Sequence, residues 1–269
     1  MQRNILLILI SVFILTSCTD TVEKRRNIIC LIDYSGTIKE ETLNSYAKII
    51  SEDLLFNLGK YDKLIVLPID EGAKTNPVYL SYIDLSQENF ENNNDGLTHK
   101  TELEDKRIKE FLKEKSDSLR THLIEQKDVR KKFTNYTDII SAISQVSTKL
   151  EYNKEISGGE EVWNGVVGET TFDIENILVI CSDMIHESKE INFRKASNEN
   201  LNNYFTELKN TNRIPNLSNI TVFVNGRTGV NNDIVENIEG FWKNYFKETN
   251  SNLSSYEFDS HNAIIEYLR

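Results

Sequence analysis

The stretch IICLIDYSGT, residues 28–37, changes character at its midpoint. Its first half is isoleucine-rich and wholly apolar, which is typical of a strand covered on both faces in a parallel sheet. Asp33, Ser35 and Thr37 then follow at alternate positions, and Gly36 permits a tight loop that turns their oxygen atoms to one side. The sequence therefore predicts a buried strand whose carboxyl end carries a cluster of oxygen donors.

A helical pattern follows this loop. The apolar residues of the pattern share one helical face: Leu43, Ala47, Ile50, Leu54 and Leu58. Thr37 and Glu40 are spaced as in a capping box, so we expect the helix to begin there. This order of strand, loop and helix places the loop at the carboxyl end of a strand, where open α/β sheets bind ligands.

The N-terminus predicts export and lipidation. Arg3 precedes an apolar run at 5–15, which is too short to span a membrane and has the length of a signal-peptide core. The run ends in Leu-Thr-Ser-Cys, with Cys18 last, and this resembles the lipobox of bacterial lipoproteins, whose cysteine becomes the lipidated first residue of the mature chain. The alternative is a plain secretory signal with an incidental Cys18.

The resemblance divides the chain into a signal peptide at 1–17, a lipidated tether at 18–26 and one domain at 27–269. Acyl chains on Cys18 would hold the protein on a membrane, since each buried methylene contributes about 0.8 kcal/mol. The resemblance implies the bacterial cell envelope, and Thr19 in place of Asp favours the outer membrane, with the domain facing the periplasm or the cell surface.

Composition restricts the class of partner. The 269-residue chain has a formal net charge of −11, and the acidic balance argues against nucleic acid. Beyond Cys18 the chain contains Cys30 and Cys181, each within an apolar run. A disulfide across adjacent parallel strands is geometrically awkward, so we expect two buried thiols.

Strand and helix patterns alternate along the rest of the chain. Strands are expected at 64–69, 78–85, 177–181, 220–224 and 256–258, and helices at 102–132, 139–150, 198–209, 233–247 and the C-terminus. This alternation predicts an α/β fold with three layers, in which a doubly wound, mostly parallel sheet has helices on both faces.

Two further segments stand out in the sequence. The densely charged segment 102–132 is expected to be a long helical insertion, either laid over the sheet or exposed as an interaction arm. Its mixed charges favour the first interpretation. The glycine-rich stretch 158–171 is expected to be a loop or hairpin that shelters the site.

Two more oxygen donors follow in later loops. Thr137 stands at the head of a helix and Asp183 follows a buried strand. Together with Asp33, Ser35 and Thr37 they form a set of oxygen ligands, as a hard cation such as Mg²⁺ requires. The set contains no His or Cys, which argues against zinc or a redox metal.

These three loops resemble the metal-ion-dependent adhesion site of the von Willebrand factor A (vWA) family, built from an Asp-x-Ser-x-Ser/Thr loop, a distant Thr and a later Asp. The resemblance implies a vWA or Rossmann-like fold and a non-enzymatic module that binds a partner protein through an acidic residue on a bound Mg²⁺, Mn²⁺ or Ca²⁺. The implied metal ligands are Asp33, Ser35, Thr37, Thr137 and Asp183. Tyr136 and Met184 depart from the family, because glycine commonly stands at both positions.

Two alternatives remain open at this stage. The loop also resembles the nucleophile loop of haloacid dehalogenase-type phosphohydrolases, with Asp33 as nucleophile. Ser35 would then replace the general acid, and it cannot supply a carboxylate proton. The second alternative is an envelope scaffold with a relict metal site.

Other polar and aromatic side chains suggest no chemistry. We expect His186 and Glu187 to be exposed at the start of a helix. We expect Phe241, Trp242, Tyr245 and Phe246 to be core residues on an amphipathic helix.

Overall fold

A computed structural model describes residues 23–75, 77–88, 90, 100–157, 172–226, 232–257 and 262–269. The expected signal peptide, Cys18 and the glycine-rich stretch 158–171 lie outside these residues. No helix in the described part of the chain is long and apolar enough to cross a membrane.

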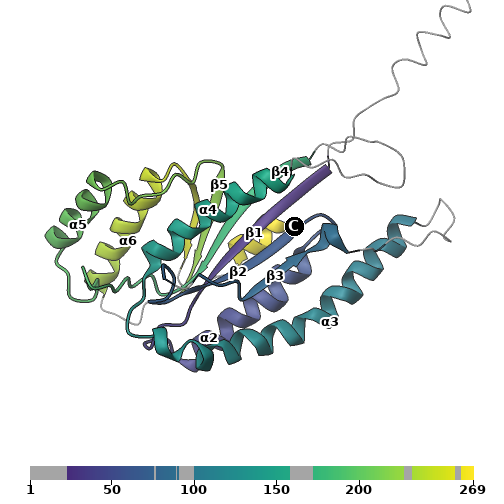
Figure 1. Cartoon of the computed structure of the whole chain (residues 1–269), viewed down its shortest axis with the longest axis horizontal. Coiled ribbons are helices and arrows are strands. Elements are labelled where there is room, and N and C mark those ends of the chain that lie inside the picture. Colours follow the sequence, from purple (N-terminus) through teal and green to yellow (C-terminus); the bar gives the residue numbers. More distant parts are fainter. Residues whose placement is uncertain are drawn as a thin grey trace, which may run out of the picture.

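The middle layer of the molecule is a six-stranded sheet in the order β3-β2-β1-β4-β5-β6 (Figure 1). All neighbouring pairs are parallel except β2 and β3, which are antiparallel. The strands are β1 (Glu23–Asp33), β2 (Lys63–Ile69), β3 (Ser81–Asp84), β4 (Phe172–Cys181), β5 (Ile220–Asn225) and β6 (Asn252–Glu257). The prediction of a mostly parallel sheet with an edge strand near 78–85 is therefore confirmed.

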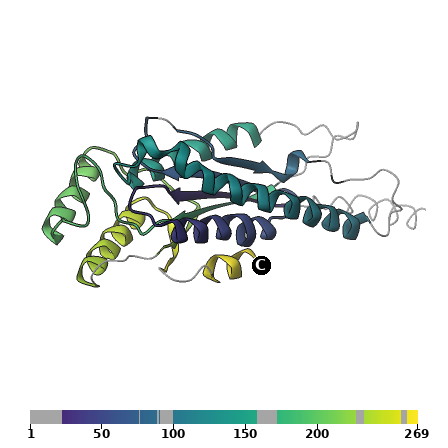
Figure 2. The ribbon, with the colours of Figure 1, turned by 90° about the horizontal axis from the view of Figure 1, so that it is seen from below.

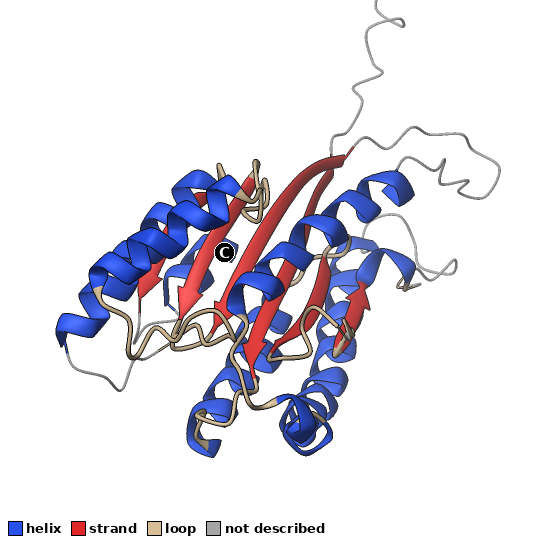
Figure 3. Cartoon of the chain, turned by 60° about the vertical axis from the view of Figure 1, so that its left-hand side comes forward, coloured by secondary structure: helices blue, strands red, loops and turns tan. Residues whose placement is uncertain are grey.

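Helices cover both faces of the sheet (Figure 3). One face packs against α4 (Ile139–Ser157), α5 (Asn198–Asn210) and α6 (Asn232–Glu248). The other face packs against α2 (Glu40–Lys48), α3 (Lys100–Val129) and α7 (Asn262–Leu268). In β1, Ile29 and Leu31 belong to the first core, because successive strand side chains point to opposite faces. The alternate residues Ile28, Cys30 and Ile32 belong to the second. The fold is thus mixed α/β with three layers.

The first strand is longer than its apolar run suggests. It begins at Glu23, inside the stretch 18–26 that we expected to be a tether. Arg26 donates to Asp62 from its backbone amide at 2.7 Å and from Nε at 2.8 Å. Because Asp62 precedes the neighbouring strand β2, these bonds join the two strands at the amino edge of the sheet.

The helix after the first loop is less regular than its periodicity predicts. α2 ends at Lys48 and is followed by a π-helical turn, η1 (Ile49–Leu54), and a 3₁₀ turn, η2 (Leu55–Asn57). The predicted capping box is wrong: Lys39 is the N-cap residue and makes no side-chain cap bond. The hydroxyl of Thr37 instead lies within hydrogen-bond distance of the Ser35 hydroxyl, at 3.1 Å.

The charged helix α3 lies along α2 rather than extending into solvent (Figure 2). Ile108, Leu112, Leu119 and Leu123 are buried in the core that includes β1 and β2. The apolar seam predicted from the sequence is therefore covered, and the interaction-arm alternative is wrong. Two short 3₁₀ turns, η3 (Leu85–Gln87) and η4 (Lys131–Phe133), complete the connections around this helix.

The two cysteines of the sheet are buried and free, as predicted. Cys30 is in register with Val179 of β4, so Cys181 lies two positions further along. Burial raises the pKa of both thiols, that of Cys181 to about 12. Both side chains are therefore neutral core residues at physiological pH.

Candidate metal centre

The strand order brings Asp33 and Asp183 together. Asp33 ends β1, and Asp183 follows the end of β4, the strand hydrogen-bonded to β1. After β1 the chain winds outward to β2 and β3, and it then returns to β4 on the other side of β1. Open α/β sheets bind ligands at such a switch point, outside the carboxyl ends of the strands.

The first loop folds back on its own acid. The Ser35 amide donates to Oδ1 of Asp33 at 2.8 Å, and the hydroxyls of Ser35 and Thr37 lie 3.1 Å apart. Asp33 and Ser35 are buried, whereas Thr37 is exposed. The oxygen donors of this loop therefore range from the buried carboxylate of Asp33 to the exposed hydroxyl of Thr37.

A tight contact joins the first loop to the second. The Gly36 amide donates to the carbonyl of Thr134 at 3.2 Å. A β-carbon at position 36 would lie 3.2 Å from that same oxygen, closer than ordinary van der Waals contact. Gly36 therefore allows close approach of the chain segment that carries Thr137.

The third loop contacts both of the others. The Glu187 amide donates to the carbonyl of Thr137 at 3.0 Å. The Ser182 hydroxyl donates to Oδ2 of Asp33 at 2.8 Å. Each of the three loops is thus hydrogen-bonded to the other two, and the structure brings together all the segments that carry the predicted ligands.

Asp33 and Asp183 are both buried. The pKa of Asp33 is raised to about 7, first by burial and then by the nearby charge of Asp183, while hydrogen bonds from Ser35 and Ser182 oppose the rise. Burial also raises the pKa of Asp183, against the effect of Arg194. Ionised Asp33 is therefore poorly compensated by the protein at neutral pH, and a cation would stabilise it.

The donor set fits a hard divalent cation. Two carboxylates and the hydroxyls of Ser35, Thr37 and Thr137 are all oxygen ligands, as Mg²⁺, Mn²⁺ or Ca²⁺ prefer. Thr137 is 2% exposed. Among the described residues no group of three His, Cys, Asp or Glu side chains could hold a metal. The hydroxyls would therefore have to complete the shell.

Arg194 belongs to the site but was missed by the sequence analysis. Its Nη2 lies 3.3 Å from Oδ2 of Asp183, and its Nε lies 3.7 Å from Oε1 of Glu187. The residue stands in an irregular segment between β4 and α5, where no periodicity marks its direction. Only the path of that segment places the guanidinium beside the acid.

Met184 keeps a glycine-like backbone. Its φ of 59° lies in the left-handed region, which a non-glycine residue rarely adopts. The Met184 side chain is fully buried, and its carbonyl accepts a hydrogen bond from Nε1 of Trp242 at 2.8 Å. Packing and this bond hold the backbone of Met184 in this conformation.

His186 is not an exposed helix-start residue, so that expectation is wrong. Its side chain is fully buried, and its ring stacks on Tyr204 and packs edge-on against Phe193. Burial lowers the pKa of His186 to about 4, so the ring is neutral. The predicted core aromatics Phe241, Trp242, Tyr245 and Phe246 are buried around the same cluster, as expected.

A second buried acid lies at the same edge of the sheet. Asp70 follows β2, and its carboxylate pairs with Nε and Nη2 of Arg130, the latter at 3.0 Å. The Gly72 amide also donates to Oδ1 of Asp70 at 2.8 Å. Both charged side chains are almost fully buried. This pair fixes the end of α3 against β2 and leaves the acid without need of another cation.

Comparisons with known proteins add little. No family model matches the chain, and no curated protein matches it. Among solved structures, the human COPII-coat protein Sec24c aligns with 92% of this chain at 11% identity and a TM-score of 0.37. The alignment covers 32% of that protein, so this chain spans about a third of its length. The architecture itself, a six-stranded, mostly parallel sheet flanked by helices, is compatible with a vWA or Rossmann-like fold.

Proposed function

We propose that the chain is a vWA-type module that binds a partner protein through a Mg²⁺-centred site. The observation that supports this most directly is the set of hydrogen bonds that joins each of the three loops to the other two, because these loops carry Asp33, Ser35, Thr37, Thr137 and Asp183. Two acids with raised pKa values add a reason for a cation to bind there.

The balance of ligands indicates what the site would recognise. Two carboxylates would neutralise a divalent ion, and the hydroxyl ligands would add no charge. A bound ion would supply an open coordination position for an acidic side chain of the partner. Arg194 adds a second positive group next to Asp183 and is 32% exposed at its side chain, so it would favour the same acid.

Calorimetric titration of the purified chain with Mg²⁺ and Mn²⁺ tests the metal centre. We expect binding by the wild type and at least about tenfold weaker binding by Asp33→Ala and Asp183→Ala, since each change removes a charged ligand. Asp117→Ala, which removes an exposed acid of α3, is the matched control and should bind normally. Absence of binding by the folded wild type would overturn the metal-centred proposal.

Capture of partners from envelope extracts, with and without a chelator, tests the biological role. A metal-dependent module should lose its partner in chelator, whereas a scaffold with a relict site should retain it. We also propose that Cys18 anchors the chain in the bacterial envelope. Incorporation of labelled palmitate that is lost in Cys18→Ser would support this anchor, and equal labelling of both would contradict it.

The phosphohydrolase alternative gains no support from the geometry. Asp33 is fully buried, and its two carboxylate oxygens accept hydrogen bonds from Ser35 and Ser182. A nucleophile needs an accessible oxygen in line with the phosphorus atom. We expect no turnover of p-nitrophenyl phosphate. Turnover that disappears in Asp33→Asn would instead favour the hydrolase.

A further inference from the structure

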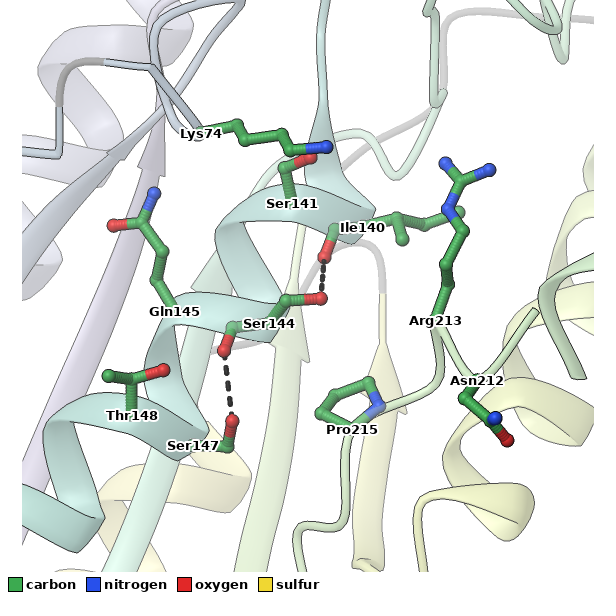
Figure 4. A pocket seen from close by; sticks show the side chains of 10 residues that line it. All are labelled: Lys74, Ile140, Ser141, Ser144, Gln145, Ser147, Thr148, Asn212, Arg213 and Pro215. Carbon is green, nitrogen blue, oxygen red and sulfur yellow. Dashed lines mark hydrogen bonds between the residues drawn. The ribbon is translucent and has the colours of Figure 1, made fainter.

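A polar groove runs along α4 on the face of the sheet that also carries α5 and α6 (Figure 4). It is a cavity of about 360 Å³ between α4 and the segment 212–215. Lys74 lies at one end of it, and Arg213 extends over its opposite wall. We call this cavity the α4 groove.

The α4 groove adjoins a second cavity near the loop that carries Thr137. A second cavity, also of about 360 Å³, shares Lys74, Ser141 and Arg213 with it. Tyr136 and Asp138 line this second cavity, and they are the residues on either side of Thr137. The second cavity thus lies beside the loop that carries Thr137, and its charged lining is mixed, with Glu71, Asp138 and Glu190 alongside Lys74, Lys189 and Arg213.

The charge of the α4 groove is opposite to that of the whole chain. Lys74 and Arg213 are the charged residues of its lining, in a protein with a formal net charge of −11. Lys74 forms no ion pair with the residues that the structure describes. Arg213 is held by Glu190, with Nη1 and Oε2 2.8 Å apart, and its side chain remains 35% exposed. Lys74 thus offers an acidic ligand a cation that no described residue pairs with, and Arg213 offers one that it would share with Glu190.

The floor of the groove presents hydrogen-bond acceptors. The hydroxyl of Ser144 donates to the carbonyl of Ile140 and that of Ser147 to the carbonyl of Ser144, both at 2.9 Å (Figure 4). The Ser141 hydroxyl donates to Oδ2 of Asp138 at 2.7 Å. Because each hydroxyl proton is engaged within the helix, the oxygen lone pairs remain available as acceptors.

Amide groups add donors to the same lining. Nε2 of Gln145 is buried and has no hydrogen-bond partner among the described residues, which is costly unless a ligand or water accepts from it. Asn212 lines the opposite wall. A mixture of donors and acceptors matches a peptide main chain, which carries one N–H and one carbonyl per residue, better than it matches a simple anion.

Resting on the proposed function, we infer that the α4 groove binds an extended acidic segment of the same partner that supplies the acid to the metal centre. The first acid lies on the metal, and further acids pair with Lys74 and Arg213. The main chain between them hydrogen-bonds to the serine oxygens and to Gln145.

The groove has the length of a short peptide. Ser141 and Thr148 both lie on α4, so at 1.5 Å per residue they are about 10 Å apart along the helix. An extended peptide advances about 3.3 Å per residue, so about three residues span this distance. The further acids should therefore be separated from one another by no more than about three residues.

Two fluorescent peptides test this inference on the full chain. Both have a glycine and serine background with one Asp. The tri-acid peptide carries further Asp residues three and five positions later, and the mono-acid peptide carries Asn there. In Mg²⁺ we expect the tri-acid peptide to bind the wild type about five- to tenfold more tightly, as two partly exposed ion pairs allow. Lys74→Gln/Arg213→Gln should abolish the difference, whereas Lys113→Gln on α3 should retain it.

The outcomes separate this inference from the proposed function. If the double variant keeps the preference for the tri-acid peptide, or the wild type binds both peptides equally, the groove assignment is overturned. Binding of inorganic phosphate that needs Lys74 and Arg213, with equal binding of the peptides, would assign a small-anion pocket instead. If chelation leaves binding of the mono-acid peptide unchanged, the metal-centred proposal is contradicted. The groove assignment is then tested by whether the tri-acid peptide still binds more tightly than the mono-acid peptide in chelator.

Discussion

Asp70 and Asp33 end neighbouring strands at the same edge of the sheet, yet their surroundings differ. Asp70 is fully compensated, because it pairs with Arg130 through two nitrogens and accepts from the Gly72 amide. Asp33 accepts hydrogen bonds from Ser35 and Ser182 but lies near a second acid, Asp183. Burial is complete for both side chains, so the difference comes from charge alone.

This difference separates a structural acid from a candidate ligand. A buried acid with a dedicated cation fixes the fold and offers nothing to a metal. A buried acid whose pKa is raised to about 7 is destabilised in its ionised form until a cation arrives. The two positions should therefore respond in opposite ways to the same substitution.

The largest expected effect is at the compensated acid. Asp70→Asn leaves the guanidinium of Arg130 buried and short of its counter-charge, so we expect a loss of about 3–5 kcal/mol in the free energy of unfolding. Urea denaturation measures it. The double variant Asp70→Leu/Arg130→Met should recover most of the loss, because an apolar pair leaves no buried charge. A loss below about 1 kcal/mol for Asp70→Asn would show that the pair does not fix α3 to β2.

The same substitution at the uncompensated acid should stabilise the metal-free chain. The pKa of Asp33 is raised from 3.8 to about 7, which corresponds to about 4 kcal/mol at most. We therefore expect Asp33→Asn to increase the free energy of unfolding in chelator at pH 8, and to remove the stabilisation that Mg²⁺ gives the wild type. Destabilisation in chelator, as at Asp70, would erase the contrast between the two sites.

The pH dependence of stability gives a finer comparison. Because the folded pKa of Asp33 is above its unfolded value of 3.8, its favourable contribution is present below that value and is lost as pH rises to about 7. In chelator, the stability difference between Asp33→Asn and the wild type should therefore grow between about pH 4 and pH 7 and then level off. Urea denaturation at each pH checks this, and a constant difference would contradict the raised pKa.

Local patterns were sufficient for much of the architecture. The apolar runs ending at Ile32, Ile69 and Cys181 marked buried strands, because a strand covered on both faces needs continuous apolar residues. The loop at Asp33, Ser35 and Thr37 could be located from spacing alone. The irregular turn after Lys48 and the early start of β1 at Glu23 could not, since long-range contacts decide both.

The residues of the candidate site likewise include some that the sequence predicted and others that it did not. Thr137 and Asp183 entered the prediction as oxygen donors at the ends of later elements, and the hydrogen bonds between loops now bring their segments together with Asp33. No pattern in the sequence marked Arg194 or Arg130 as a neighbour of a buried acid. Which acid each arginine meets depends on the path of an irregular segment, and no local pattern encodes that path.

The sequence by itself determined the alternation of strands and helices, the faces they bury and the oxygen-rich end of the first strand, because each follows from residues close together in the chain. Only the tertiary structure decided which of the buried acids forms an ion pair with an arginine. Asp70 and Asp33 both stand at the ends of apolar strands. The fold places a cation, Arg130, beside Asp70, whereas it places a second acid, Asp183, near Asp33.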